Sequence, residues 1–165
     1  MIYNLSKNNK TINGIIEIGG SKSESNRLLM LKNYSSDFKI TNLSRSDDTK
    51  ILVDALNSSE KKIDIHHAGT AMRFLLSYYA SKQNLEVVLT GSDRMKNRPI
   101  GILVNALRYL GANIEYQGKE GYPPIKIIGK TLISNEVSLP ANISSQYISS
   151  LMMLGVKIEN GIKLK

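Results

Sequence analysis

The residues best suited to chemistry lie where a run of aliphatic residues gives way to a polar turn. The segment Gly19–Arg27 reads GGSKSESNR, and four apolar residues follow it at once. Ser21 and Glu24 have the S-x-x-E spacing of a capping box, which predicts a helix start. A helix start exposes unpaired backbone N–H groups and a partial positive charge, so it attracts anions. Because Lys22 adds a full positive charge there, the turn predicts a site for a small anion.

Ser23 and Arg27 extend this pattern, because residues four apart share one face of a helix. A hydroxyl and a guanidinium on the same face could bind one anionic group together. An ordinary capped helix with solvated charges would show the same residues. Neighbouring segments therefore have to decide between the two interpretations.

Similar turns occur twice more along the chain. His67–Arg73 (HAGTAMR) and Ser144–Gln146 (SSQ) each precede an apolar, helix-like run, and Arg94–Arg98 places three cations before a proline. The sequence ILVDAL at 51–56 also returns as ILVNAL at 102–107. A repeat of roughly fifty residues indicates stacked supersecondary units. If a rotation relates the units, their polar helix starts would converge at one end and form a strong anion site.

Hydrophobic periodicity and turn residues predict an alternation of helices and strands. We expect helices over 24–33, 49–56, 74–80, 100–110 and 147–154, and strands over 15–18, 39–43, 62–66, 85–90, 113–116, 125–128 and 161–165. Ser46 with Asp47 and Asp48 is expected to start the second helix, because acidic residues are stabilising there. The elements predict an α/β protein with the polar turns at helix starts.

Composition limits the possible functions. The chain has 165 residues, a net charge of +8 and no cysteine, which excludes a thiolate nucleophile and a cysteine metal site. The only two histidines, His66 and His67, are adjacent and would point to opposite faces of a strand, so we expect no metal and no cofactor. No apolar run reaches the length of a membrane span, and a cytoplasmic location is expected. The lysines are scattered, which favours small anions over nucleic acid.

Four motifs, in this order, resemble one family across nearly the whole chain. They are GSKS with Asn26 and Arg27, AGTAMR at 68–73, RMK with the Arg-Pro-Ile of 98–100, and SSQY at 144–147. The chain is similar in these motifs to 3-phosphoshikimate 1-carboxyvinyltransferase, also called 5-enolpyruvylshikimate-3-phosphate synthase. This family transfers the enolpyruvyl group of phosphoenolpyruvate to the 5-hydroxyl of shikimate 3-phosphate and releases phosphate. The resemblance implies this reaction in aromatic amino-acid biosynthesis.

The resemblance also implies roles for individual residues. Lys22 would be the catalytic residue and would contact both substrates. The shikimate 3-phosphate site would comprise Lys22, Ser23, Arg27, Ser144, Ser145 and Gln146. The phosphoenolpyruvate site would comprise Lys22, Gly69, Arg98 and Gln146. Both substrates carry a phosphate and a carboxylate, so cations and helix-start amides suit them.

The fold implied by the resemblance is α/β, with repeated βαβαββ units of the enolpyruvyl transferase fold, an inside-out α/β barrel-like domain with helices inside and sheets outside. Family members are more than twice as long, so the chain is expected to be an N-terminal fragment that is inactive alone. Residues 1–15 would be a strand segment that packs with the absent second domain. Residues 16–165 would be two units and the start of a third. The general base is expected in the missing C-terminal half, a partner of this chain.

Two departures and two alternatives remain open. The family usually has Asn at the position of His67 and Pro at that of Phe74, both beside the phosphoenolpyruvate loop. The sister enzyme that acts on UDP-N-acetylglucosamine is one alternative, but it typically has Asn after the early lysine and a catalytic cysteine loop. A non-catalytic module that binds anions or nucleic acid is the other.

Arg73 is expected to brace the Gly69 loop, held by nearby carboxylates.

Overall fold

A computed structural model of the chain describes residues 3–4, 6, 11, 13–35, 37–140, 142 and 144–165. Its α-helices are α1 (Lys22–Tyr34), α2 (Asp47–Asn57), α3 (Gly69–Ser81), α4 (Asp93–Lys96), α5 (Gly101–Tyr109) and α6 (Ser145–Leu154), and a 3₁₀ turn follows at Gly155–Lys157. Its strands are β1 (Lys62–Asp64), β2 (Glu86–Thr90), β3 (Asn113–Tyr116), β4 (Ile125–Ile128), β5 (Glu136–Val137) and β6 (Lys163–Leu164).

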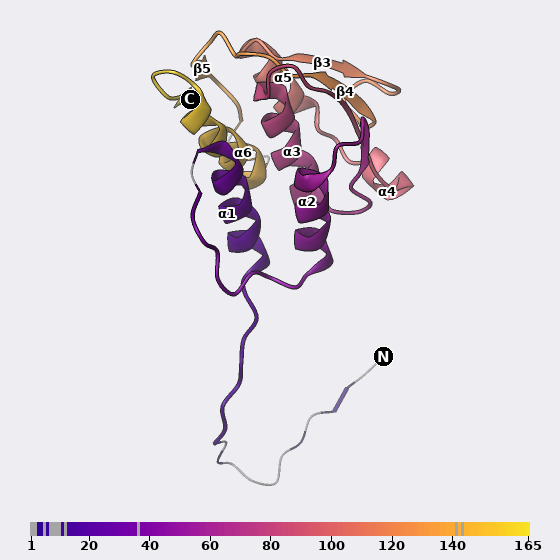
Figure 1. The fold of residues 1–165 in the computed structure, drawn as a ribbon. Helices are drawn as coiled ribbons and strands as arrows, with labels where there is room; N and C mark the ends of the chain where they lie inside the picture. Colours follow the sequence, from indigo (N-terminus) through magenta and orange to yellow (C-terminus); the bar gives the residue numbers. More distant parts are fainter. Residues whose placement is uncertain are drawn as a thin grey trace.

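The larger sheet has the strand order β1-β2-β4-β3 (Figure 1). β1 and β2 are parallel and are connected through α3, whereas β4 is antiparallel to both β2 and β3. The predicted βαβαββ order is therefore present from β1 to β4. β5 and β6 are again parallel and are connected through α6, which repeats the first half of that unit. The prediction of an α/β chain built from such units is confirmed.

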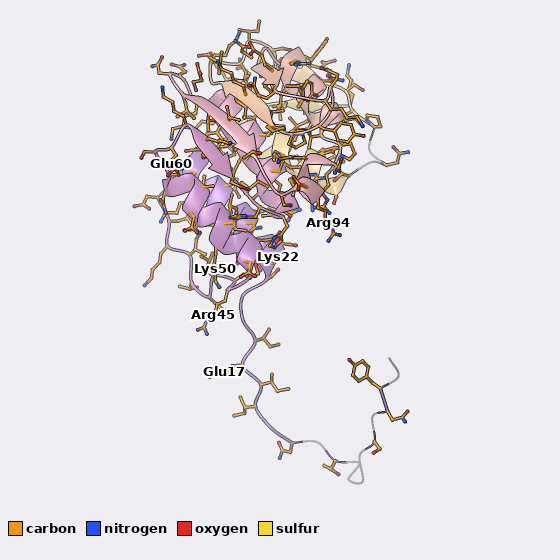
Figure 2. All side chains as sticks on the ribbon, turned by 90° about the vertical axis from the view of Figure 1, so that its right-hand side faces the viewer. Glu17, Lys22, Arg45, Lys50, Glu60 and Arg94 are labelled. Atoms are coloured by element: carbon orange, nitrogen blue, oxygen red, sulfur yellow. The ribbon has the colours of Figure 1, made fainter. Side chains whose placement is uncertain are left out.

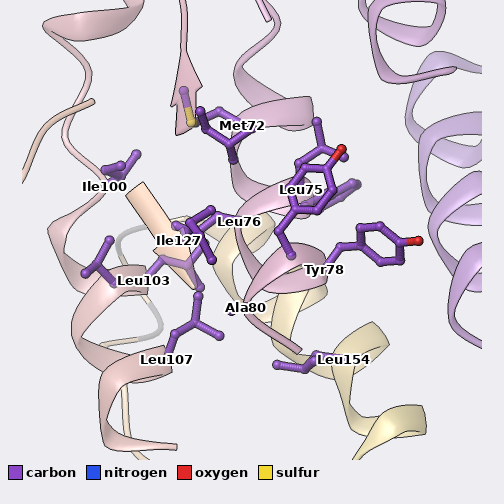
Figure 3. Packing of buried hydrophobic residues seen from close by; sticks show 14 of the residues in the cluster. Met72, Leu75, Leu76, Tyr78, Ala80, Ile100, Leu103, Leu107, Ile127 and Leu154 are labelled. Carbon is purple, nitrogen blue, oxygen red and sulfur yellow. The ribbon is translucent and has the colours of Figure 1, made fainter. Parts of the chain in front are cut away.

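α3 is the central element, because it packs against α1, α2, α5 and α6 and against strands β2 and β4. Met72, Leu75 and Leu76 are fully buried on it, together with Ala71 and Phe74 (Figure 3). A helix that is apolar on all sides has to be buried on all sides. α3 thus lies at the centre of the helices, and the four-stranded sheet covers one side of them (Figure 1).

Two predicted strands are wrong. Residues 15–18 form no strand within the described part of the chain, and Ile15 is 98% exposed. Residues 39–43 form none either, because Asn42 has a φ of 53°, which breaks an extended conformation. Without a paired neighbour, β-branched residues alone do not make a strand. Residues 13–19 instead lead away from the folded body (Figure 1).

The N-terminal segment 1–15 lies largely outside the described residues, and its packing with a second domain stays a prediction. The predicted strand at 62–66 ends early, because β1 stops at Asp64 and His66 has a φ of 48°. The other predicted helices and strands are confirmed, with ends that differ by a few residues. β6 is also shorter than the strand expected over 161–165.

Candidate active site

The start of α1 has the predicted cap. The Ser21 hydroxyl accepts a hydrogen bond from the backbone N–H of Glu24 at 3.4 Å, and α1 begins at Lys22. The ammonium of Lys22 lies 3.8 Å from a carboxylate oxygen of Asp48, in the first turn of α2. The two helices therefore start side by side, and the Lys22 ammonium faces the Asp48 carboxylate between their first turns.

Buried polar residues fix this pairing of helix starts. Asn26 is fully buried, and its Oδ1 accepts a hydrogen bond from the Thr49 hydroxyl at 2.7 Å. The Ser25 hydroxyl accepts from the backbone N–H of Ser44 at 2.9 Å, just before α2. Buried polar groups of this kind specify one arrangement when they are paired. Asn26 therefore holds α2 against α1 and does not line the site.

The start of α3 carries the second predicted turn. Arg73 donates from Nη1 to the carbonyl of Gly69 at 2.7 Å, which confirms that Arg73 braces the Gly69 turn. The expectation that carboxylates hold this guanidinium is wrong for the described residues, where Arg73 forms no ion pair. The ring of Tyr147 holds it instead, 5.4 Å from Cζ to the ring centroid.

The guanidinium of Arg98 also lies beside the Gly69 turn. A Cβ atom at Gly69 would overlap Nη1 of Arg98 and would lie 3.0 Å from Nη1 of Arg73. Glycine leaves room for both guanidinium groups in these positions, whereas a larger residue would displace the Arg98 guanidinium. The Arg98 side chain is exposed and has no hydrogen bond or ion pair with a described residue. Its donors are therefore available for a ligand.

α6 supplies the third helix start. Ser144 is its N-cap and accepts a hydrogen bond from the backbone N–H of Gln146 at 3.2 Å. The amide of Gln146 donates to the Thr70 hydroxyl at 3.3 Å, which ties α6 to the start of α3.

α1 and α6 are also connected. Arg27 donates to the Ser149 hydroxyl at 3.0 Å and to the carbonyl of Ser23 at 2.9 Å. The guanidinium lies over the ring of Phe74, with 5.6 Å between Cζ and the centroid. Phe74 thus lies beneath Arg27, a predicted substrate-binding residue. A proline has no aromatic ring and could not make this cation–π contact.

One cavity of about 470 Å³ joins these helix starts. It is lined by Lys22, Asp48, His67, Gly69, Thr70, Arg73, Arg94, Met95, Arg98, Ser144 and Gln146. The expected convergence of helix starts is therefore present at this cavity. Lys22 and Arg94, which belong to different elements, lie at the same end of the folded body (Figure 2).

The structure separates the predicted site residues into two groups. Five of them line the cavity: Lys22, Gly69, Arg98, Ser144 and Gln146. The other three, Ser23, Arg27 and Ser145, lie outside its lining, on the first two turns of α1 and α6. Ser23 and Ser145 are exposed, whereas Arg27 is partly buried.

Sequence reasoning did not assign five polar residues of the cavity. Asp48 was interpreted as a helix-start residue, which is correct, but it also pairs with Lys22. Arg94, one of the three cations noted before Pro99, lies on the short helix α4, capped by Ser92. Thr70, His67 and Arg73 stood within a recognised motif. Their position in that motif was a signal that could have found them.

The cavity favours anionic ligands. Four cationic side chains and one carboxylate line it, and helix starts contribute unpaired N–H groups. Fixed cations and amide dipoles can bind phosphate and carboxylate groups and can offset charge that develops during a reaction. The arrangement suits the binding of small polyanionic ligands.

The fold is that of EPSP synthase. Two solved structures of EPSP synthase from Acinetobacter baumannii match with TM-scores of 0.78 and 0.76, each covering 88% of this chain and at most 39% of theirs, at 22% identity. A family model described as EPSP synthase (3-phosphoshikimate 1-carboxyvinyltransferase) matches residues 52–165. The chain belongs to this family.

Curated relatives carry the same name. A 3-phosphoshikimate 1-carboxyvinyltransferase of Bacteroides fragilis (strain YCH46) is 48% identical over 155 residues, covering 93% of this chain and 38% of that protein. The one of Colwellia psychrerythraea is 38% identical over 181 residues, covering 93% and 42%. The chain thus spans about two fifths of the length of these relatives. Among the described residues, no helix is long and apolar enough to cross a membrane.

Proposed function

We propose that the protein to which this chain belongs transfers the enolpyruvyl group of phosphoenolpyruvate to the 5-hydroxyl of shikimate 3-phosphate and releases phosphate. Family membership supports this reaction, because the matching family and relatives carry that name. A place in the shikimate pathway of aromatic amino-acid biosynthesis and a cytoplasmic location belong to the same proposal.

The observation that carries the proposal is the composition of the cavity. All four residues expected for phosphoenolpyruvate, namely Lys22, Gly69, Arg98 and Gln146, line it. Phosphoenolpyruvate has a phosphate and a carboxylate on a three-carbon frame, so it needs several donors close together. The free guanidinium of Arg98 and the ammonium of Lys22 supply charge-assisted hydrogen bonds. Gly69 lets the ligand approach the start of α3.

We assign shikimate 3-phosphate to the place where the first turns of α1 and α6 meet. Lys22 and Gln146 line one cavity, and Arg27 meets Ser149 about one turn farther along both helices, so the two helices start at the same end. Ser23 precedes Arg27 by four residues, and Ser145 precedes Ser149 by four. Their exposed hydroxyls therefore stand on the cavity side of the Arg27 contact.

Ser144 lines the cavity next to Ser145, and we assign both to the phosphate of shikimate 3-phosphate. Gln146 is proposed to lie between the two substrates. Lys22, which lines the cavity at the start of α1, is proposed to contact both substrates and to be the catalytic residue. In the reaction, the shikimate hydroxyl oxygen bonds to C2 of phosphoenolpyruvate, the bond from C2 to the phosphate oxygen breaks, and the released phosphate takes up, overall, the proton that the hydroxyl loses. An ammonium beside both groups offsets the phosphate charge and can take part in proton transfer.

The rest of the site is proposed to come from chain that this sequence does not include. The relatives are more than twice as long as the part matched here. Further cations and a carboxylate base from that part would close the cavity over the substrates. No cofactor, metal, nucleic acid or membrane enters the proposal.

The test uses the full-length protein. Phosphate release should require both phosphoenolpyruvate and shikimate 3-phosphate, and UDP-N-acetylglucosamine should not replace the latter. Release with the sugar nucleotide alone as acceptor would make the protein the sister enzyme. No release with either acceptor, from a protein that melts cooperatively, would contradict the proposed function.

A further inference from the structure

Tyr147, at the start of α6, contacts two other walls of the cavity without lining it. The residue is 4% exposed, and its hydroxyl donates to the carbonyl of Pro99 at 2.8 Å. Its ring lies against the guanidinium of Arg73 at 5.4 Å. A single side chain therefore connects α6 with the Arg98–Pro99 segment and with α3.

Arg73 carries this connection to the Gly69 turn. It donates from Nη1 to the carbonyl of Gly69 at 2.7 Å, whereas its buried Nε has no partner among the described residues. A guanidinium without an ion pair depends on its remaining contacts, which are the glycine carbonyl and the ring of Tyr147. The position of this guanidinium is thus set by the Gly69 carbonyl and the Tyr147 ring together.

The other contact of Tyr147 acts on Arg98. Proline has a fixed φ, so a bond to the carbonyl of Pro99 restrains the backbone that carries the Arg98 side chain. Few other bonds hold this segment: the Arg98 N–H donates to Met95 at 2.9 Å, and the Ile100 N–H donates to Gly121 at 2.9 Å. Within the described part of the chain, the Arg98 side chain has no polar partner.

We propose that Tyr147 is a positioning residue that sets the separation of Arg98 and Gly69, and thereby the binding of the phosphoenolpyruvate phosphate or carboxylate. The assignment of that ligand rests on the proposed function. The restraint itself does not, because it concerns contacts within the chain. Tyr147 touches neither substrate region directly and acts through Pro99 and Arg73.

The test is Tyr147→Phe in the full-length protein, which keeps the ring beside Arg73 and removes only the hydroxyl bond. Loss of one neutral hydrogen bond is expected to change a binding constant by about three- to tenfold. We expect the KM for phosphoenolpyruvate to rise by that factor and the KM for shikimate 3-phosphate to change less than twofold. Hydrogen exchange of the backbone amides in 95–100 should become faster by a similar factor without any ligand.

The matched control is Tyr79→Phe. Tyr79 is also buried on a helix, and its hydroxyl donates to the carbonyl of Ala55 at 2.7 Å, away from the cavity. This variant loses the same kind of bond and should leave both KM values and the exchange of 95–100 unchanged. Tyr147→Leu, which also removes the ring beside Arg73, should shift the KM for phosphoenolpyruvate further than Tyr147→Phe.

The outcomes separate the two proposals. Unchanged exchange at 95–100 in Tyr147→Phe would overturn the positioning role, whatever the substrate. Faster exchange with equal rises in both KM values would overturn the link to phosphoenolpyruvate. If the wild-type protein had no activity, the proposed function would fail, and the exchange measurement would still decide the positioning role.

Discussion

The cations of the Gly69 turn and of the segment before Pro99 differ in how many partners they have within the chain. Arg73 is held by Gly69 and Tyr147, and Lys96 pairs with Asp93 at 3.1 Å. Arg98 has no polar partner among the described residues. An unpaired guanidinium beside a glycine can give two parallel bonds to a phosphate or carboxylate. Of these three cations, Arg98 is therefore the best placed to bind the anion.

Arg98→Lys in the full-length protein tests this difference. The change keeps the charge but loses the bidentate geometry. We expect the KM for phosphoenolpyruvate to rise about tenfold, which corresponds to about 1.4 kcal/mol, and the KM for shikimate 3-phosphate to change much less. Arg94→Lys, on the cavity wall, should have a smaller effect on either, and Arg45→Lys, outside the cavity, should have none. Equal small effects of Arg98→Lys on both substrates would make Arg98 an ordinary loop cation.

Arg27 poses a different question, because its side chain is already engaged. It bonds to Ser23 and Ser149 and lies over Phe74. A guanidinium has five N–H donors, so several remain for a ligand. The residue can therefore hold α1 against α6 and bind shikimate 3-phosphate at the same time.

Arg27→Ala should weaken binding of shikimate 3-phosphate by about 1.5–3 kcal/mol, the cost of losing a hydrogen bond to a charged group. Calorimetric titration of the full-length protein measures this. Ser149→Ala is the control, because it removes the protein partner of Arg27 and leaves the guanidinium in place; its effect should be at least several-fold smaller. If Arg27→Ala bound shikimate 3-phosphate as tightly as the wild type, the assignment of Arg27 would be wrong, while family membership would stand.

At the scale of elements, the helices around α3 bury tyrosine side chains among apolar residues. Tyr79 donates to Ala55 of α2, whereas the buried hydroxyl of Tyr34, on α1, has no partner among the described residues. Burial, with a smaller effect of nearby Tyr78, raises the pKa of both phenols above the usual value. Both stay neutral in the folded protein at pH values where the unfolded chain begins to ionise.

This arrangement predicts a loss of stability at alkaline pH. A raised pKa in the folded state gives stability that is complete below the unfolded pKa of about 10 and is lost as the pH rises above it. Urea unfolding of the full-length protein between pH 8 and 11 should show this fall. Tyr79→Phe and Tyr34→Phe should each make the fall shallower, and a fall as steep as in the wild type would contradict the prediction.

At neutral pH the same two variants should differ. Tyr79→Phe removes a hydrogen bond and should lower the free energy of unfolding by about 0.5–1.5 kcal/mol. Tyr34→Phe removes a hydroxyl that has no such bond to any described residue, so it should cost less or even stabilise. A larger loss for Tyr34→Phe than for Tyr79→Phe would show that the Tyr34 hydroxyl has a partner.

At the scale of the whole molecule, the residues of this chain are expected to form only part of the proposed site. The chain matches about two fifths of its relatives. We expect the purified 165-residue chain not to release phosphate from phosphoenolpyruvate and shikimate 3-phosphate above the rate without protein. Release that requires both substrates would show that this chain holds a complete site. Addition of the remaining part of the protein should restore release.

The sequence by itself determined the local features of the site. Ser21 and Ser144 were predicted to begin helices, and both cap them, because a hydroxyl next to a helix start satisfies an unpaired N–H over a few residues. The residues of the Gly69 turn and Arg98 were found from motifs that are continuous in the chain. Short-range chemistry of this kind is written in neighbouring residues.

Strand pairing and contacts across the cavity were decided only by the tertiary structure. Residues 15–18 have a strand composition but no partner, and Asn42 interrupts residues 39–43, so neither segment joins a sheet. Asp48 faces Lys22 because the buried bond of Asn26 to Thr49 aligns α1 with α2, although the paired residues are far apart in sequence. Tyr147 reaches Pro99 in the same way. Such contacts depend on how helices pack around α3, which no local pattern specifies.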